Sequence, residues 1–401
     1  MSNPETTETR RNIPNWALAF GVAVVFSVVY AATAVWTESE VNVDAVAAAL
    51  PAWSLAEHGT MNLPEGALAN PWVVKGPNGN FSNRPPGNFL VAWPAYVLTG
   101  GPTFSSAPAT ATAVLLTAAA LAFLFLTLTK VMNVGSALVA VAVFGLGTAT
   151  WPISSAQLWP HGIGQLTAAI AICGLASERY LLSGVAFGAG ILIRPPTALF
   201  PAVTGVGESL NSPAGRLRPL LSIGIPSAVG LAALMLYNLS VFGELGISGG
   251  YSPAFADNLT SMPWSDYVSN LVAMFAGPRN GLFLWSPVIL IALVALPLVW
   301  KEAPSWSRTA FIAGVVYLVV HARLNRASGG LAFNYRYPLE PLVLMAPLVG
   351  VAAQELFQRS GLARVMVTVG AVFSILLQAL YVFTLTCEPS GAGSSLCSLG
   401  V

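Results

Sequence analysis

The sequence predicts an all-α polytopic membrane protein with about eleven transmembrane helices. Of its 401 residues, 55% are hydrophobic and only 8% are charged, whereas globular proteins carry about 25% charged residues. Apolar runs of about 20 residues, the length that crosses a bilayer, recur from end to end, and no polar block exceeds roughly 70 residues. We therefore expect one integral membrane domain over residues 1–401.

The first apolar run, Trp16 to Trp36, is long enough to span a membrane. Acidic residues follow it, rather than the small residues of a signal-peptide cleavage site, so we expect it to remain as an anchor behind a cytoplasmic tail at 1–14. By apolar content, the spans are expected near 15–36, 107–129, 136–153, 160–177, 181–194, 196–210, 219–241, 282–300, 309–323, 338–356 and 365–386.

The distribution of lysine and arginine predicts the orientation, because cytoplasmic loops carry an excess of both. With the N-terminus inside, ten of the 17 basic residues fall in short cytoplasmic connections: Arg10, Arg11, Lys130, Arg179, Arg216, Arg218, Lys301, Arg308, Arg359 and Arg364. Arginine exceeds lysine throughout, which is typical of a GC-rich genome, so we expect a bacterial cytoplasmic membrane. The tail at 387–401 then lies outside, where Cys387 and Cys397 can form a disulfide.

The segment "NRPPGNFLVAWPAYVLTGG" is apolar but too short to be a span. It holds only about thirteen residues between Pro86 and Gly100, against the ~20 that a helix needs to cross the bilayer. Counting it as a span would also place Lys130 outside. We predict instead an outer loop at 37–106 with two juxtamembrane helices, near 42–58 and 87–99.

Basic residues that break the positive-inside trend gather on the outer side in this arrangement. They are Lys75, Arg84, Arg194, Arg279, Arg323, Arg326 and Arg336. Many acids lie there too, and such a mixed surface built from distant loops is expected of a site that handles an anionic lipid headgroup. Solvated loop charge is the alternative.

Two of these arginines stand beside helix-breaking residues. Arg194 lies in "GAGILIRPPTALFP", where irregular backbone at membrane depth usually lines a polar cavity; a structural ion pair is the alternative. Arg279 lies in "FAGPRNGLFLWSPVILI", where a turn exposes backbone N–H groups beside the guanidinium. We predict phosphate binding for both, with an interfacial anchor as the alternative for Arg279.

The segment "GGLAFNYRYPLEPL" combines an arginine, two tyrosines and an acid just before a span. Arg336 can bind a phosphate through two parallel hydrogen bonds, and Tyr335 and Tyr337 offer rings and hydroxyls to a sugar. Glu340 is expected to orient one of the arginines and to line the sugar or acceptor site. His161, in "TATWPISSAQLWPHGIGQL", is a further candidate for binding sugar hydroxyls, with a residue of the interfacial aromatic belt as the alternative.

The acids after the first span, Glu38, Glu40 and Asp44, are the candidates for acid–base chemistry. A carboxylate at the membrane surface can take the proton from an acceptor hydroxyl as it attacks an activated sugar. We predict Asp44 as this base, with Glu38 and Glu40 as substitutes. Glu40 shares a helical face with Asp44 if the helix extends back to Glu40. A simple first-turn acid, favoured by the helix macrodipole, is the alternative for Asp44.

At several of these motifs the chain resembles the GT-C superfamily of membrane glycosyltransferases, which includes protein O-mannosyltransferases, lipid A aminoarabinose transferases and arabinofuranosyltransferases. Asp44 in "NVDAVAAALPAWSLAEHGTMNL" is similar to the catalytic aspartate, and "FSNRPPGNFLVAWP" resembles the basic-Pro-Pro segment, which gives Arg84 a phosphate-binding role. "GVAFGAGILIRPPTALFP" resembles the glycine-rich helix that ends in a basic residue. The resemblance covers about 15–345.

The resemblance implies an inverting glycosyltransferase that moves a monosaccharide, arabinofuranose or mannose, from a polyprenyl-phosphate donor. The acceptor is a glycan, a lipid or a protein at the outer face; membrane lipid is the other partner and no nucleic acid is expected. The chain is shorter than typical members, so we expect loops or a partner to recognise the acceptor. No acid occurs in 151–162, where some relatives place one beside a metal, so a divalent cation is not supported there. A lipid-linked saccharide flippase and an inactive GT-C-like scaffold are the alternatives.

Overall fold

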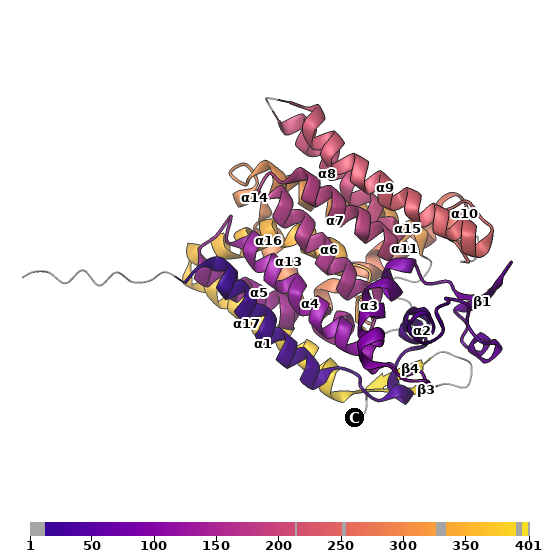
Figure 1. The fold of residues 1–401 in the computed structure, drawn as a ribbon. Helices are drawn as coiled ribbons and strands as arrows, with labels where there is room; N and C mark the ends of the chain where they lie inside the picture. The colour runs from indigo at the N-terminus through magenta and orange to yellow at the C-terminus, as the bar shows by residue number, and fades with distance from the viewer. Residues whose placement is uncertain (1–12, 213–214, 251–253, 326–333, 390–394, 400–401) are drawn as a thin grey trace, which may run out of the picture.

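The computed structural model describes residues 13–212, 215–250, 254–325, 334–389 and 395–399. Most of the cytoplasmic tail predicted at 1–14, with Arg10 and Arg11, lies outside these ranges, and so does Arg326. Nearly all the described secondary structure is helical, apart from two two-stranded sheets (Figure 1). The predicted all-α class is confirmed.

Helices form at each of the eleven predicted spans. They are α1 (Asn15–Thr33), α4 (Ala107–Leu128), α5 (Val134–Gly147), α6 (Pro160–Leu175), α7 (Tyr180–Ile193), α8 (Leu199–Asn211), α9 (Leu217–Phe242), α15 (Ser305–Leu324), α16 (Leu339–Arg359), α17 (Gly361–Thr384) and, at 282–300, three short pieces. Those pieces are α12 (Leu282–Trp285), α13 (Pro287–Val294) and α14 (Leu296–Val299). Prolines at 287 and 297 interrupt this run because proline lacks the amide that continues a helix.

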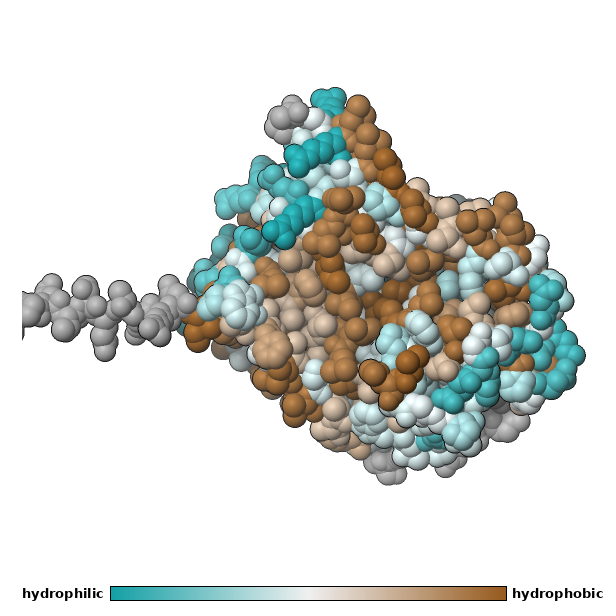
Figure 2. Space-filling view, viewed as in Figure 1, coloured by the Kyte–Doolittle hydropathy of each residue, from teal (hydrophilic) through white to brown (hydrophobic). Residues whose placement is uncertain are grey.

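Within the described ranges, six helices are long and apolar enough to cross a membrane: α1, α4, α9, α15, α16 and α17. The apolar helices α5 and α7 are shorter. Large hydrophobic side chains such as Phe20, Leu236 and Phe383 remain exposed on the outer helices, and Figure 2 shows a broad hydrophobic surface on one face. A surface of this extent needs lipid to cover it, as in a multi-pass membrane protein.

The contact between α7 and α9 is closely packed through small residues. A Cβ atom on Gly230 of α9 would lie 2.3 Å from the carbonyl oxygen of Gly188 on α7, which leaves no room for a side chain. Such contacts let two membrane helices approach closely. They fix the position of α7, whose last residue precedes Arg194.

The outer loop contains both predicted juxtamembrane helices, α2 (Val43–His58) and α3 (Pro86–Thr99). They pack together through a small core that includes Ala48, Phe89 and Ala92. Between them lies an antiparallel hairpin that the sequence did not predict, β1 (Val73–Gly76) and β2 (Gly79–Ser82). The helices α10 (Ala254–Ser261) and α11 (Trp264–Ala276) were not predicted either.

The end of the chain forms a second hairpin, β3 (Leu385–Pro389) and β4 (Ser395–Leu399). Its register places Cys387 directly opposite Cys397. Antiparallel partners have Cα separations that a disulfide can bridge. The two side chains lie outside the described part of the chain, so the disulfide stays a prediction.

Candidate active site at the helix ends

Asp44 is the second residue of α2, and the helix begins there because Asn42 caps it. The Asn42 Oδ1 atom accepts a hydrogen bond of 2.9 Å from the Asp44 amide, and an asparagine cap satisfies an amide that the helix leaves unpaired. Glu40 is exposed and belongs to a separate 3₁₀ turn, Glu38–Glu40. The helix therefore does not extend back to Glu40, and the condition for a face shared with Asp44 is not met.

The Asp44 carboxylate joins two arginines that are far apart in sequence. Arg84 Nη2 lies 3.3 Å from Oδ1, and Arg336 Nη1 lies 3.4 Å from Oδ2. The three side chains are 11–16% exposed, so the group is largely buried yet open to solvent. The structure thus brings together the predicted base and two of the predicted phosphate-binding residues.

Each of these arginines rests on a tryptophan. The Arg84 guanidinium lies 4.1 Å from the Trp72 ring centre, and that of Arg336 lies 4.8 Å from the Trp159 ring centre. Arg84 directly precedes Pro85, the N-cap of α3, and a following proline disfavours a helical conformation at the residue before it. Stacking on a ring orients a guanidinium while leaving its edge available for other partners.

Arg336 remains a cation in this setting. Burial lowers the pKa of its guanidinium, but Tyr337 and Asp44 raise it more, so the pKa lies above its ordinary value. The Tyr337 hydroxyl lies 3.5 Å from Arg336 Nη2. The positive charge needed to bind a phosphate is therefore permanent at this position.

A second, deeper cluster forms around Glu340, the second residue of α16. Arg194 Nη1 lies 2.9 Å from Oε1 and 3.0 Å from Oε2 of this carboxylate, and His161 Nδ1 lies 3.0 Å from Oε1. Glu340 is completely buried. Arg194 follows α7 directly because Pro195 and Pro196 end the helix there. Arg194 thus makes the ion pair that was its alternative role, and Glu340 orients it.

His321 on α15 belongs to this cluster and was missed by the sequence analysis. Its Nε2 atom lies 3.3 Å from Arg194 Nη2 and 3.1 Å from Asn325 Nδ2. It occupied the predicted span 309–323, and an ionisable residue within a span is by itself a signal of a functional site. That signal was available in the sequence.

Tyr337 links the two clusters. Its ring centre lies 5.2 Å from the Arg336 guanidinium and 5.3 Å from that of Arg194. The His321 ring meets it edge-on at 4.5 Å. Tyr337 is mostly buried, and its ring is a neighbour of both guanidiniums.

The other two predicted site residues have different surroundings. Tyr335 is fully buried in an apolar core, where its hydroxyl lies 2.7 Å from Ser286 Oγ and accepts a hydrogen bond from the Ala149 amide. The Arg279 carbonyl accepts hydrogen bonds from the Asn334 amide and from Trp285 Nε1. These contacts hold the turn before α12, and neither residue is joined to Asp44 by a contact between described side chains.

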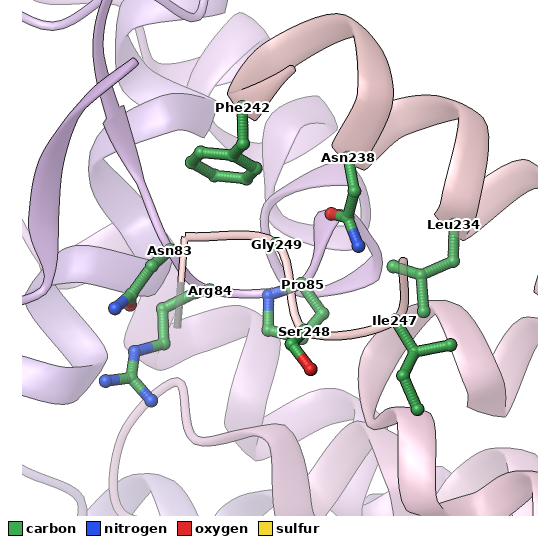
Figure 3. Close-up of a pocket in the computed structure, with 9 residues that line it drawn as sticks. All are labelled: Asn83, Arg84, Pro85, Leu234, Asn238, Phe242, Ile247, Ser248 and Gly249. Atoms are coloured by element: carbon green, nitrogen blue, oxygen red, sulfur yellow. The ribbon is translucent and has the colours of Figure 1, made fainter. Parts of the chain in front are cut away.

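A small pocket lies beside Arg84, between residues 83–85 and the end of α9 (Figure 3). Its far wall contains Leu234, Asn238 and Phe242. Figure 3 shows the Arg84 guanidinium turned away from that wall. The charged end of Arg84 therefore belongs to the Asp44 cluster.

Metal ligands are not grouped at this site. Over the described ranges, no three His, Cys, Asp or Glu side chains come together in a way that would hold a metal ion. The expectation from 151–162 that a divalent cation is not supported stays a prediction.

Comparison with protein-family profiles gave no match, and comparison with curated sequences gave none. Comparison with solved structures identified ArnT from Cupriavidus metallidurans bound to undecaprenyl phosphate. The TM-score is 0.51 at 15% sequence identity, and the match covers 88% of this chain. The chain is similar in fold to ArnT. It spans 62% of the ArnT chain, so the similarity concerns the fold and not the activity of the whole enzyme.

Proposed function

We propose that this protein is an inverting glycosyltransferase that uses a polyprenyl-phosphate-linked monosaccharide. It would act at the outer face of a bacterial cytoplasmic membrane as one integral membrane domain. The observation that carries the proposal is the contact of the Asp44 carboxylate with Arg84 and Arg336. A base and two phosphate-binding cations then lie within reach of one substrate.

The charge of the two clusters supports an anionic ligand. They contain two carboxylates, Asp44 and Glu340, and three guanidiniums, Arg84, Arg194 and Arg336. One positive charge is thus in excess, and a phosphate diester on the donor lipid would balance it. Because the group is shielded from water, its electrostatic interactions are stronger than they would be in bulk solvent.

The reaction would proceed by direct displacement at the anomeric carbon. As the donor phosphate engages Arg84 and Arg336, the Asp44 carboxylate becomes available to the acceptor hydroxyl. The acceptor oxygen attacks the anomeric carbon while its proton passes to Asp44. The bond from that carbon to the phosphate oxygen breaks, and polyprenyl phosphate leaves with the bonding electrons, stabilised by the two guanidiniums.

Transfer by purified protein from synthetic lipid-phosphate arabinofuranose or mannose tests this proposal. Asp44→Asn should lower turnover by about 10²–10⁴-fold, the usual contribution of a general base, while the melting temperature stays near that of the wild type. Glu40→Gln is the matched control, because Glu40 is exposed in the neighbouring turn, and should retain activity. Wild-type turnover in Asp44→Asn, or lipid translocation in liposomes with no glycosylated product, would contradict the proposal.

A further inference from the structure

A second polar cavity lies at the other end of α7 from the Asp44 and Glu340 clusters. Tyr180 begins α7, whereas Arg194 directly follows it, and 14 residues of helix rise about 21 Å. Its lining includes charged and polar residues from four helices or the segments just before them, among them Glu178, Tyr180, Glu208, Arg218 and Ser305. None of these residues takes part in the proposed transfer reaction.

Glu208 on α8 is the most unusual residue of this cavity. It is only 5% exposed. Thr309 forms a hydrogen bond with its carboxylate, but the Oε1 atom has no hydrogen-bond partner among the residues that the structure describes. A buried carboxylate oxygen without a donor is costly, and such groups usually have a partner. Glu208 lines the cavity, so its carboxylate is a buried acceptor beside any donor that occupies the cavity.

The charges around the cavity indicate a ligand of mixed charge. Two carboxylates, Glu178 and Glu208, and one guanidinium, Arg218, line it together. Their complement is an ammonium group that donates hydrogen bonds next to an anionic group such as a phosphate.

Exposed leucines surround this end of the bundle. They are Leu181 and Leu182 at the start of α7, Leu210 at the end of α8, and Leu217 and Leu221 at the start of α9. Figure 2 shows hydrophilic residues near the α8–α9 connection beside a hydrophobic stripe along α9. A polar cavity bordered by exposed apolar side chains suits a ligand with a polar headgroup and hydrocarbon chains.

We propose that this cavity binds the headgroup of an aminophospholipid, with Glu208 and Glu178 accepting hydrogen bonds from its primary ammonium and Arg218 facing its phosphate. The site is independent of the glycosyl-transfer proposal, and its test does not use transferase activity. Two carboxylates supply too few oxygens for the cage that Ca²⁺ requires. Mg²⁺ can bind through one or two carboxylates and water, so the test below includes Mg²⁺ as a competing ligand.

Thermal unfolding of the full-length protein in nanodiscs tests the assignment. One set of discs contains phosphatidylglycerol and phosphatidylethanolamine, and the other contains phosphatidylglycerol and phosphatidylcholine. The trimethylammonium group of phosphatidylcholine cannot donate the hydrogen bonds that the ammonium of phosphatidylethanolamine donates. Native mass spectrometry of protein released from the same discs counts the retained lipids. The wild type should melt higher with phosphatidylethanolamine and retain it over phosphatidylcholine by about tenfold, as expected for hydrogen bonds to a charged group.

Glu208→Gln and Arg218→Gln should each reduce this preference severalfold. Glu302→Gln, an exposed carboxylate just before α15, is the matched control and should keep it. If Glu208→Gln does not fold, Glu178→Gln at the exposed rim of the cavity provides the same readout. Equal retention of both lipids by the wild type would overturn the proposal. An unchanged lipid preference in the Glu208 and Arg218 variants would also overturn it. So would soluble phosphoethanolamine or Mg²⁺ that stabilises the protein in phosphatidylcholine discs as much as phosphatidylethanolamine does.

Discussion

Replacing Glu340 with glutamine is expected to destabilise the protein by about 3–5 kcal/mol, the usual cost of removing one partner from a buried ion pair. The Glu340 carboxylate is fully buried and has three contacts of 2.9–3.0 Å, two with Arg194 and one with His161. Glutamine keeps the shape but removes the charge, which leaves the Arg194 guanidinium buried without a counter-ion. The full cost applies because water does not reach this position.

The measurement is the free energy of unfolding in mixed detergent micelles. Glu355→Gln is the matched control, because Glu355 forms an i,i+4 pair of 3.3 Å with Arg359 on the same helix, and its side chain is 42% exposed. Loss of such a surface pair should cost less than about 0.5 kcal/mol. The double variant Arg194→Gln/Glu340→Gln should be more stable than the sum of the single changes predicts. A loss below about 1 kcal/mol in Glu340→Gln alone would refute the reasoning.

Two further changes test the packing of this cluster and the end of the chain. In Gly164→Ala, the new methyl group would lie 2.8 Å from Glu340 Cγ, so thermal unfolding should show that the protein loses about 1–3 kcal/mol of stability. The control is Gly224→Ala, which has no atom within 4 Å of the added carbon and should lose no stability. The opposed positions of Cys387 and Cys397 predict that maleimide labels one cysteine of the unreduced, denatured protein and all three after reduction. Three labelled thiols before reduction would contradict the disulfide.

The apolar runs predicted the helices well because each run must satisfy its backbone hydrogen bonds within the membrane. The same reasoning separated the juxtamembrane helix α3 from the spans by its length. It could not find α11, since a helix of 13 residues with a polar face has no membrane-length signal. The β1–β2 hairpin was missed because each strand has only four residues and its turn, "PNG", lies in a polar loop.

The composition of the site could be predicted, but not how its residues pair. Arginines near helix ends were recognisable as candidates because charge is costly near a membrane. Which carboxylate each arginine meets depends on how the helices pack: Asp44 and Arg336 are 292 positions apart. Tyr335 and Tyr337 show the same limit, since residues two apart in an irregular segment have such different surroundings, one in an apolar core and one beside two guanidiniums.

The two clusters are coupled by the short segment 336–340, which leads into α16. Arg336 reaches Asp44, Tyr337 is a neighbour of both guanidiniums, and Glu340 binds Arg194. Any shift of this turn therefore moves a member of both clusters. A buried ion pair adds little net stability compared with a well-packed apolar core, but here it fixes the turn that holds Arg336. The deep cluster thus determines the position of the guanidinium that, in the proposed reaction, meets the departing phosphate.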